Sequence, residues 1–302
     1  MKRRFFTLDV FTETPLAGNQ LAVFPDAAGL PGDRLQAIAR ELNLSETVFV
    51  YPPLDPLNTA RVRIFTPAVE LPFAGHPTVG TAILLATLKR VRRRGGKARV
   101  VLEEGVGAVP VEVRYSGSTP TWAQLTTARL PEGGPPPPDD AVLAAAISLE
   151  PADLDPDMPP AAFSCGVPFL FVPVRNRSAL AAASPDLVQW RAALGDYWAP
   201  DLFLFTRDAE LSGSDFSSRM FAPLLGVPED PATGSAVAAL AGYLAAHERL
   251  GDGRHNWRIE QGFKMGRPSI IELESDVRDG IVYTVRVGGN AVLVSEGELR
   301  LG

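Results

Sequence analysis

Residues 76–83 read His-Pro-Thr-Val-Gly-Thr-Ala-Ile, and residues 230–237 read Asp-Pro-Ala-Thr-Gly-Ser-Ala-Val. Each segment follows a strand-like pentapeptide of one pattern, Arg-Ile-Phe-Thr-Pro at residues 63–67 and Arg-Met-Phe-Ala-Pro at residues 219–223. Internal repeats of this kind pack as equivalent structural units. The chain is therefore predicted to be a duplication, with two similar lobes related by an approximate twofold axis and a cleft between them.

Both copies pass through Gly and Thr or Ser into an apolar run, which predicts a helix in each lobe. The free N–H groups and positive dipole end of a helix N-terminus suit a carboxylate or an enolate. The ionisable residue four positions before the glycine differs between the copies: it is His76 before Gly80 and Asp230 before Gly234. The repeat therefore predicts a symmetric scaffold that carries asymmetric chemistry.

The composition is that of a globular protein with a substantial core. The 302 residues are 46% apolar and carry a formal net charge of −6, which allows two lobes and argues against nucleic acid as a partner. The basic run at residues 89–94 follows an apolar stretch, where cations complement a helix C-terminus. The longest uncharged stretch of the second repeat, residues 231–246, is shorter than the roughly 20 residues of a membrane span. We expect neither a nucleic-acid nor a membrane partner.

Cysteine use and the N-terminal residues indicate the compartment. Cys165 is the only cysteine, so an intrachain disulfide and a cysteine zinc site are excluded, and the thiol is expected to be a small buried hydrophobe. Residues 2–4, Lys-Arg-Arg, are similar to the start of a signal peptide, but Asp9 interrupts the apolar residues that follow. A cytoplasmic location is expected.

Strand and helix patterns alternate along the chain, which predicts an α+β fold. Helices are expected at residues 33–42, from near Pro77, at 142–148 and along the second repeat. Strands are expected at residues 5–11, 19–24, 47–51, 61–65, 98–103, 106–113, 122–127, 169–174, 202–206, 219–223, 269–274, 281–287 and 291–295. The Pro- and Gly-rich residues 131–138 cannot lie inside a sheet, so we place an N-terminal lobe at residues 1–130 and a C-terminal lobe at residues 139–302.

Three local patterns give more specific expectations. Gly288-Gly289-Asn290 is typical of a hairpin turn, so the last two strands are expected to form a hairpin, which could pack back towards the first lobe. Ser184, with a proline after it, is expected to cap a helix. Asp201 is expected at the surface because the Trp-Ala-Pro before it is typical of a loop.

Three ionisable residues are candidates for chemistry, and each also has an ordinary structural interpretation. His76 stands between a glycine and a proline, where the chain turns into a helix and where a loop histidine could bind backbone. Glu46 precedes an apolar strand, as many solvated carboxylates do. Asp230 stands where a helix N-cap or first-turn anion would. The residues alone leave both interpretations open.

Four motifs occur together in a fixed order. They are Gly-Asn-Gln-Leu-Ala-Val at residues 18–23, Ser-Glu-Thr-Val-Phe at 45–49, Leu-Pro-Phe-Ala-Gly-His-Pro at 71–77 and Asp-Pro-Ala-Thr-Gly-Ser at 230–235. With these motifs the chain resembles the PhzF family of phenazine-biosynthesis isomerases over nearly its full length. The resemblance implies the diaminopimelate-epimerase-like fold, in which two pseudo-symmetric lobes each wrap a mixed, mainly antiparallel sheet around a central helix. It also implies a homodimer.

The same resemblance implies an active site, carried over position by position. The acid/base carboxylate of the family falls on Glu46, and its supporting catalytic residues fall on His76 and Asp230. The positions around the substrate are Asn19, Ser45, Gly75, Thr233, Gly234 and Ser235. Arg267 has two open interpretations, as a contact to an acidic substrate or as part of a fixed surface turn.

The activity implied by the resemblance is an isomerisation without cofactor or metal. The better known family members isomerise trans-2,3-dihydro-3-hydroxyanthranilate by moving a proton from one ring carbon to another. We therefore expect a small carboxylate-bearing, cyclohexadienyl type of substrate, whose identity the sequence leaves open. Helix N-termini would stabilise the charge left when the proton leaves. Burial would have to raise the pKa of Glu46 so that this carboxyl also returns the proton.

Two other functions stay open. An amino-acid epimerase or racemase of the same fold needs two opposed bases, commonly one cysteine from each lobe, and Cys165 is at neither long-helix start. A non-catalytic metabolite-binding or scaffold protein could keep the fold, although it need not keep Glu46, His76 and Asp230 together. The sequence has no nucleotide-binding glycine loop and no His-Glu-x-x-His motif, which argues against nucleotide and zinc chemistry.

Overall fold

The structure, a computed structural model, describes residues 2–301. It is an α+β protein in which strands predominate. The chain divides into two compact units. Unit 1 comprises the residues up to Ala128 together with those from Arg286 onward, and unit 2 comprises Arg129–Val285. The last strand, β18 (Ile281–Arg300), therefore starts in unit 2 and contributes most of its length to unit 1.

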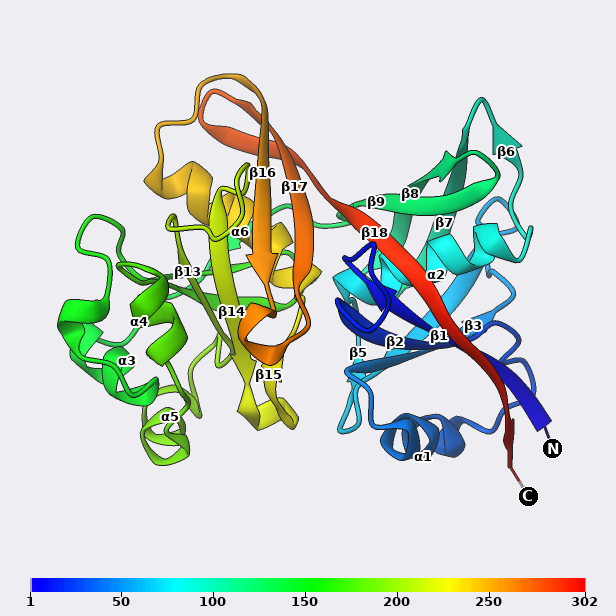
Figure 1. The fold of residues 1–302 in the computed structure, drawn as a ribbon, viewed down its shortest axis with the longest axis horizontal. Helices are drawn as coiled ribbons and strands as arrows, with labels where there is room; N and C mark the ends of the chain where they lie inside the picture. The colour runs from blue at the N-terminus through cyan, green and yellow to red at the C-terminus, as the bar shows by residue number, and fades with distance from the viewer. Residues whose placement is uncertain (1, 302) are drawn as a thin grey trace. The chain divides into compact units, whose positions relative to one another are not determined.

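Unit 1 is a ring of strands around one helix (Figure 1). Its remaining strands are β1 (Lys2–Val10), β2 (Asn19–Phe24), β3 (Glu46–Tyr51), β4 (Ala60–Phe65), β5 (Glu70–Leu71), β6 (Arg93–Arg94), β7 (Lys97–Glu104), β8 (Gly107–Ser116) and β9 (Thr119–Thr126). Its helices are α1 (Gly32–Leu42) and α2 (Gly75–Thr87). The ladders run β1–β2–β3–β4–β7–β8–β9–β18 and return from β18 to β1, which closes the ring.

The central helix α2 is apolar on every side because it lies inside this ring. All its residues from Gly75 to Ala86 are buried, as expected of a helix without a solvent face. Gly80 marks the closest approach of α2 to the sheet. A Cβ at this position would lie 2.6 Å from Leu21 Cδ2 and 2.7 Å from Val10 Cγ2. Only glycine allows this packing without displacement of a neighbour.

Unit 2 repeats the same order of strand pairings. Its strands are β10 (Glu132–Gly133), β11 (Ala161–Ser164), β12 (Pro168–Pro173), β13 (Leu202–Thr206), β14 (Phe216–Ala222), β15 (Val227–Asp230), β16 (Gly253–Gln261) and β17 (Ser269–Arg278). The series antiparallel, parallel, antiparallel, parallel, antiparallel runs from β1 through β2, β3, β4 and β7 to β8. The identical series runs from β11 through β12, β13, β14 and β16 to β17.

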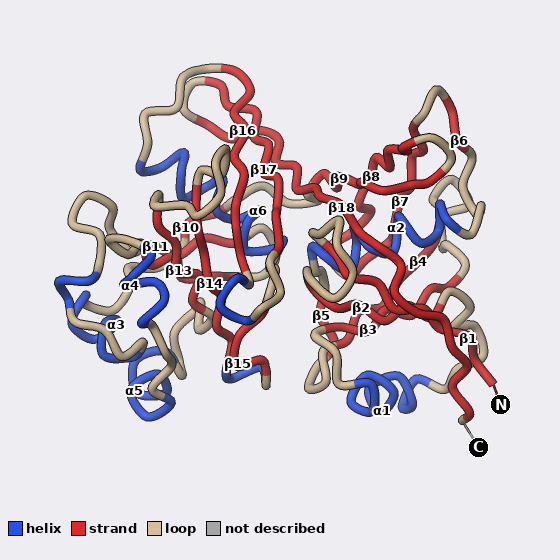
Figure 2. Tube along the Cα trace, viewed as in Figure 1, coloured by secondary structure: helices blue, strands red, loops and turns tan. Residues whose placement is uncertain are grey.

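The helices of unit 2 are one buried helix and a peripheral group. They are α3 (Asp140–Ala146), α4 (Arg177–Ala182), α5 (Leu187–Leu194) and α6 (Gly234–His247). Helix α6 is buried from Gly234 to Leu244, like α2 in unit 1. Figure 2 shows α3, α4 and α5 gathered on one side of unit 2, where they share a hydrophobic cluster that contains Trp190 and Leu180.

The prediction of a hairpin at residues 288–290 is wrong. Strand β18 continues through Gly288 and Gly289, which pair with Gln124 and Ala123 of β9. A Cβ at Gly288 would lie 2.9 Å from the Ala123 carbonyl oxygen, so this glycine permits close packing and makes no turn. The turn lies instead before β18, at Asp279 and Gly280, whose φ angles are 51° and 73°. An Asp-Gly pair with two positive φ angles is a favoured hairpin signal.

Two further local predictions are wrong. The cap of α5 is Asp186, whose carboxylate accepts hydrogen bonds from the backbone of Val188 and Gln189, whereas Ser184 uses its backbone N–H to reach Ile147. Asp201 is buried, with 3% of its surface exposed, because it leads directly into the buried strand β13. The expectation that Cys165 is buried is confirmed. Within residues 2–301, no helix combines the length and the hydrophobicity needed to cross a bilayer.

The packing of Gly80 gives a test of this fold. We predict that Gly80→Val lowers the free energy of unfolding by about 1–3 kcal/mol, because the added methyl groups overpack the contact with β1 and β2. Denaturant titration measures this loss. The control is Gly251→Ala, where nothing lies within 4 Å of the added Cβ. Equal stability of the two variants would contradict the close approach of α2 to the sheet.

Candidate functional site

Three of the candidate residues of unit 1 come together because of how β2, β3 and α2 begin. Asn19 is the first residue of β2, Glu46 is the first residue of β3, and His76 is the second residue of α2. Strands β2 and β3 are parallel, with Leu21 beside Glu46. Their N-terminal ends therefore lie at one edge of the sheet, and α2 starts at the same edge.

His76 lies between the other two side chains. Its Nδ1 is 3.1 Å from Asn19 Nδ2, and its Nε2 is 3.1 Å from Glu46 Oε2. The His76 side chain is 3% exposed and the Glu46 side chain is 13% exposed. The Asn19 amide and Nδ1 form a hydrogen bond whose direction depends on the tautomer of the ring. Nε2 approaches Glu46 Oε2 without the geometry of a hydrogen bond.

The imidazole of His76 is neutral. Burial disfavours the imidazolium and lowers the pKa of His76 to about 3. The 3.1 Å contact with Glu46 is therefore an approach of a neutral ring to a carboxyl group, and no ion pair forms at neutral pH. A neutral ring orients a carboxyl without permanently neutralising it.

The start of α2 also leaves backbone donors available. No side chain caps the helix at Ala74, so the N–H groups of Gly75 and His76 are not taken by a capping side chain. Ser45, half-buried, immediately precedes Glu46. Unit 1 thus places Asn19, Ser45, Glu46, Gly75 and His76 at one end of the ring.

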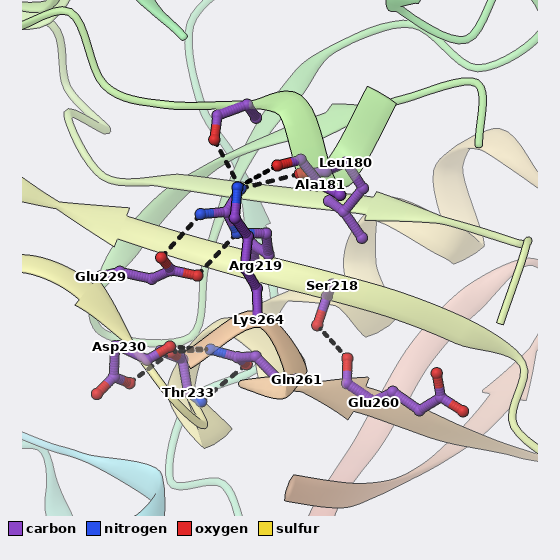
Figure 3. A network of polar contacts seen from close by, with 11 residues as sticks. Leu180, Ala181, Ser218, Arg219, Glu229, Asp230, Thr233, Glu260, Gln261 and Lys264 are labelled. Atoms are coloured by element: carbon purple, nitrogen blue, oxygen red, sulfur yellow. Dashed lines mark hydrogen bonds and ion pairs between the residues drawn. The ribbon is translucent and has the colours of Figure 1, made fainter. Parts of the chain in front are cut away.

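The candidates of unit 2 form a second group around the start of α6 (Figure 3). Asp230 ends β15, and Thr233 occupies the N-cap position of α6. The Thr233 hydroxyl does not cap the helix but donates to Asp230 Oδ2 over 2.6 Å. The first residues of α6, Gly234 and Ser235, are buried. Asp230 is therefore held by its own loop, four residues before the helix starts.

Gln261, the last residue of β16, holds this loop. Its Nε2 donates to the Asp230 carbonyl oxygen (2.8 Å) and to Thr233 Oγ1 (2.9 Å), while its Oε1 accepts from the Thr233 backbone N–H (3.0 Å). Gly262 follows with φ 79° and leaves no room for a Cβ beside the Pro231 carbonyl oxygen, 2.6 Å away. In the sequence, only the pair Gln261-Gly262 marks this position. The burial that gives the glutamine its role is not visible there.

A buried ion pair fixes the strand that carries Asp230. Arg219 of β14 binds Glu229 of β15 through two hydrogen bonds of 2.7 and 2.8 Å. The same guanidinium donates to the carbonyl oxygens of Leu180 and Ala183, as Figure 3 shows for Leu180. A bidentate pair with additional acceptors holds both strands in register. Because Asp230 follows Glu229 in the same strand, the ion pair also fixes the position of Asp230.

Other groups lie outside these two clusters. Burial raises the pKa of Asp201 to about 7 and that of the Cys165 thiol to about 12, so neither is an ordinary solvated group. Arg267 lies in the turn after Gly266 and donates its backbone N–H to Gly262. In the described part of the chain, no three His, Cys, Asp or Glu side chains gather in a way that could hold a metal ion.

The hydrogen bonds of Gln261 predict a structural loss when they are removed. In Gln261→Leu the Thr233 N–H and the Asp230 carbonyl oxygen lose their partner, and each such buried group costs about 1–3 kcal/mol. We expect the free energy of unfolding to fall by at least about 2 kcal/mol in denaturant titration. Gln189→Leu, an exposed position on α5, is the matched control. A fall no larger than that of the control would refute the role of Gln261.

Known proteins are similar to this chain in sequence and fold. The sequence profile of the PhzC-PhzF family, described as phenazine biosynthesis-like protein, matches residues 8–297. An uncharacterised isomerase of Mesorhizobium japonicum is 43% identical over 302 residues, which cover 98% of each chain. The trans-2,3-dihydro-3-hydroxyanthranilate isomerase of Pseudomonas aeruginosa is 37% identical, with 99% of each chain covered. A solved PhzF-family protein of Bacillus anthracis superposes with a TM-score of 0.87 at 25% identity over 100% of both chains. The chain therefore belongs to the PhzC-PhzF family, and it is an isomerase.

Proposed function

We propose that this isomerase moves a proton between two carbons of a small, carboxylate-bearing substrate and that Glu46 is its general acid/base. The observation that supports this most directly is the placement of the Glu46 carboxyl 3.1 Å from the neutral ring of His76. One relative acts on trans-2,3-dihydro-3-hydroxyanthranilate by its name. A substrate of the same kind, a carboxylate on a cyclohexadiene ring, is the class proposed here.

In this mechanism His76 holds one oxygen of Glu46 and leaves the other for substrate. Nε2 of the imidazole lies 3.1 Å from Oε2, and the hydrogen bond between the Asn19 amide and Nδ1 holds the ring in place. Oε1 then takes a proton from a substrate carbon and returns it to another carbon of the same molecule. The two steps balance, because the carboxyl ends in the state in which it began.

The charge that develops on the substrate needs donors that are fixed before the reaction. The backbone N–H groups of Gly75 and His76, at the uncapped start of α2, are such donors. We propose that Asn19, Ser45, Gly75, Thr233, Gly234 and Ser235 bind the substrate. Asp230 is proposed as a second catalytic carboxyl, with the Thr233 hydroxyl and Gln261 fixing its position.

The proposal predicts a large and specific loss in Glu46→Gln. The amide keeps the shape of the side chain but cannot accept a proton from carbon, and general acid/base groups contribute about 10²–10⁴-fold to rates. Purified protein is incubated in D2O with trans-2,3-dihydro-3-hydroxyanthranilate and related cyclohexadienyl acids, and carbon-bound deuterium and products are followed by NMR. We expect turnover by wild type and a fall of at least about 100-fold in the variant.

Glu41→Gln is the matched control, since Glu41 is exposed on α1, and it should keep wild-type rates. Full activity of Glu46→Gln would disprove the assignment of the acid/base group. The product identifies the reaction: a shifted double bond supports the proposal, whereas inversion at a single carbon would show an epimerase instead.

A further inference from the structure

Glu104 is a buried carboxyl that the proposed mechanism does not use. It ends β7, in the inward row that begins with Ala98, Val100 and Leu102. Strand alternation gives this row to apolar residues, yet its last member is a glutamate with 9% of its surface exposed. A carboxyl at a core position needs either a charged partner or a proton.

The contacts of Glu104 are those of a protonated carboxyl. The Thr78 hydroxyl oxygen lies 2.6 Å from Glu104 Oε1 and 2.7 Å from the Ala74 carbonyl oxygen. A hydroxyl has one proton, so it cannot donate fully to two acceptors. If Glu104 carries a proton, it donates to Thr78 Oγ1, and the Thr78 proton goes to Ala74. Both short contacts are then ordinary hydrogen bonds.

A second observation agrees with the neutral form. Glu104 Oε2 is buried and has no hydrogen-bond partner among residues 2–301. An unpartnered oxygen costs far less on a neutral acid than on a carboxylate. Burial correspondingly raises the pKa of Glu104 to about 8, and the bond with Thr78 only partly opposes this shift.

The chain of hydrogen bonds from Glu104 through Thr78 ends at Ala74, in the turn that carries His76. Ala74 is the N-cap residue of α2, and its carbonyl oxygen also accepts the first helical hydrogen bond, from the Thr78 N–H (3.3 Å). The turn after Glu104 makes a second link to the same segment, because the Val106 N–H donates to the Pro72 carbonyl oxygen over 3.1 Å. The first turn of α2 is therefore anchored to the end of β7.

We propose that Glu104 is a positioning residue for His76: its neutral carboxyl donates to Thr78, Thr78 donates to Ala74, and this chain fixes the first turn of α2 so that the imidazole meets Glu46. The role of Glu104 in catalysis rests on the proposed function, whereas the chain of hydrogen bonds from Glu104 to Ala74 does not. Ionisation of Glu104 would draw the Thr78 proton away from Ala74 and loosen the turn.

Among residues 2–301, the charged groups that border Glu104 form no ion pair with it. A cavity of about 440 Å³ borders Glu104 and is lined in addition by Arg61 and Arg63 of β4 and Glu70 of β5. Arg63 is neutralised by two 2.7 Å hydrogen bonds to Glu70. Arg61 lies over the ring of Tyr51, 5.1 Å from its centroid. His76, the titratable residue of α2, is neutral. The cavity lets solvent exchange the proton.

Glu103, the neighbour of Glu104 on β7, provides the matched control. It binds the backbone N–H groups of Leu54 and Asp55 and the Asn58 side chain, and the first of these bonds helps to lower its pKa. Glu103 is therefore ionised throughout the range in which Glu104 titrates. Glu103→Gln removes a carboxyl from the same strand without changing the state of Glu104.

The test follows the carboxyl and the ring by NMR, without substrate. In protein labelled at the glutamate carboxyl carbon and the histidine ring nitrogens, we expect one carboxyl resonance to titrate near pH 8 and the His76 resonances to shift with the same midpoint. Both changes should vanish in Glu104→Gln, whose amide donates to Thr78 at every pH, and persist in Glu103→Gln. Thr78→Val should uncouple His76 from the carboxyl, and Thr78→Ser should restore the coupling.

A carboxyl of Glu104 that titrates in the ordinary acid range would overturn the proposal. His76 resonances that do not shift when Glu104 titrates would also overturn the proposal. If Glu104→Gln does not fold, the Thr78→Val and Thr78→Ser pair decides the same point. With an active substrate, kcat of wild type should fall by about tenfold above the midpoint, without a matching change in KM, and Glu104→Gln should lack this fall. If NMR shows the coupling between Glu104 and His76 but the protein is inactive on every substrate, the proposed function is contradicted. The proposed chain of hydrogen bonds from Glu104 to Ala74 would still stand.

Discussion

The burial of α2 from Gly75 to Ala86 is the constraint on which the rest of unit 1 depends. A helix inside a ring of strands satisfies its backbone internally along its length, but its first turn cannot. The N–H groups at that end therefore either bind other groups or stay unpaired, which lowers the stability of the fold. In this chain no side chain caps it, and Asn19, Glu46 and His76 gather there because β2 and β3 begin at the same edge. The position of the site follows from the packing of the helix.

Burial also sets the charge state of the groups around α2. Both His76 and Glu104 are shifted towards their neutral forms, the first to a pKa of about 3 and the second to about 8. In each case desolvation is the largest cause, and it disfavours whichever form is charged. A ring that stays neutral beside a carboxyl can share a hydrogen bond without fixing a proton. Burial in unit 1 therefore keeps both His76 and Glu104 neutral at pH 7.

The sequence predicts the parts of this structure that depend on local pattern. The repeat, the apolar helices and most strands follow from periodicity, and Glu46 and His76 follow from motifs that resemble a known family. Features that depend on burial are not predicted from the sequence. Gly288 has the composition of a turn but lies in a strand against the Ala123 carbonyl oxygen, and Asp201 follows a loop-like tripeptide but is buried. Gln261 and Glu104 are ordinary polar residues until their neighbours are known.

The duplication explains why the two units share architecture but differ in chemistry. The equivalent pairs Arg63–Glu70 and Arg219–Glu229 both bind bidentately, so both copies kept the interaction that ties a strand to the following short one. At the edge where the two parallel strands begin, unit 1 has Glu46 beside an imidazole, whereas unit 2 has the buried Asp201. The equivalent of His76 in the repeat is Asp230, a second carboxyl. An imidazole in both copies, or in neither, would give the two units the same proton chemistry. The scaffold repeats because packing demands it, whereas the ionisable side chains before the two central helices, His76 and Asp230, differ between the copies.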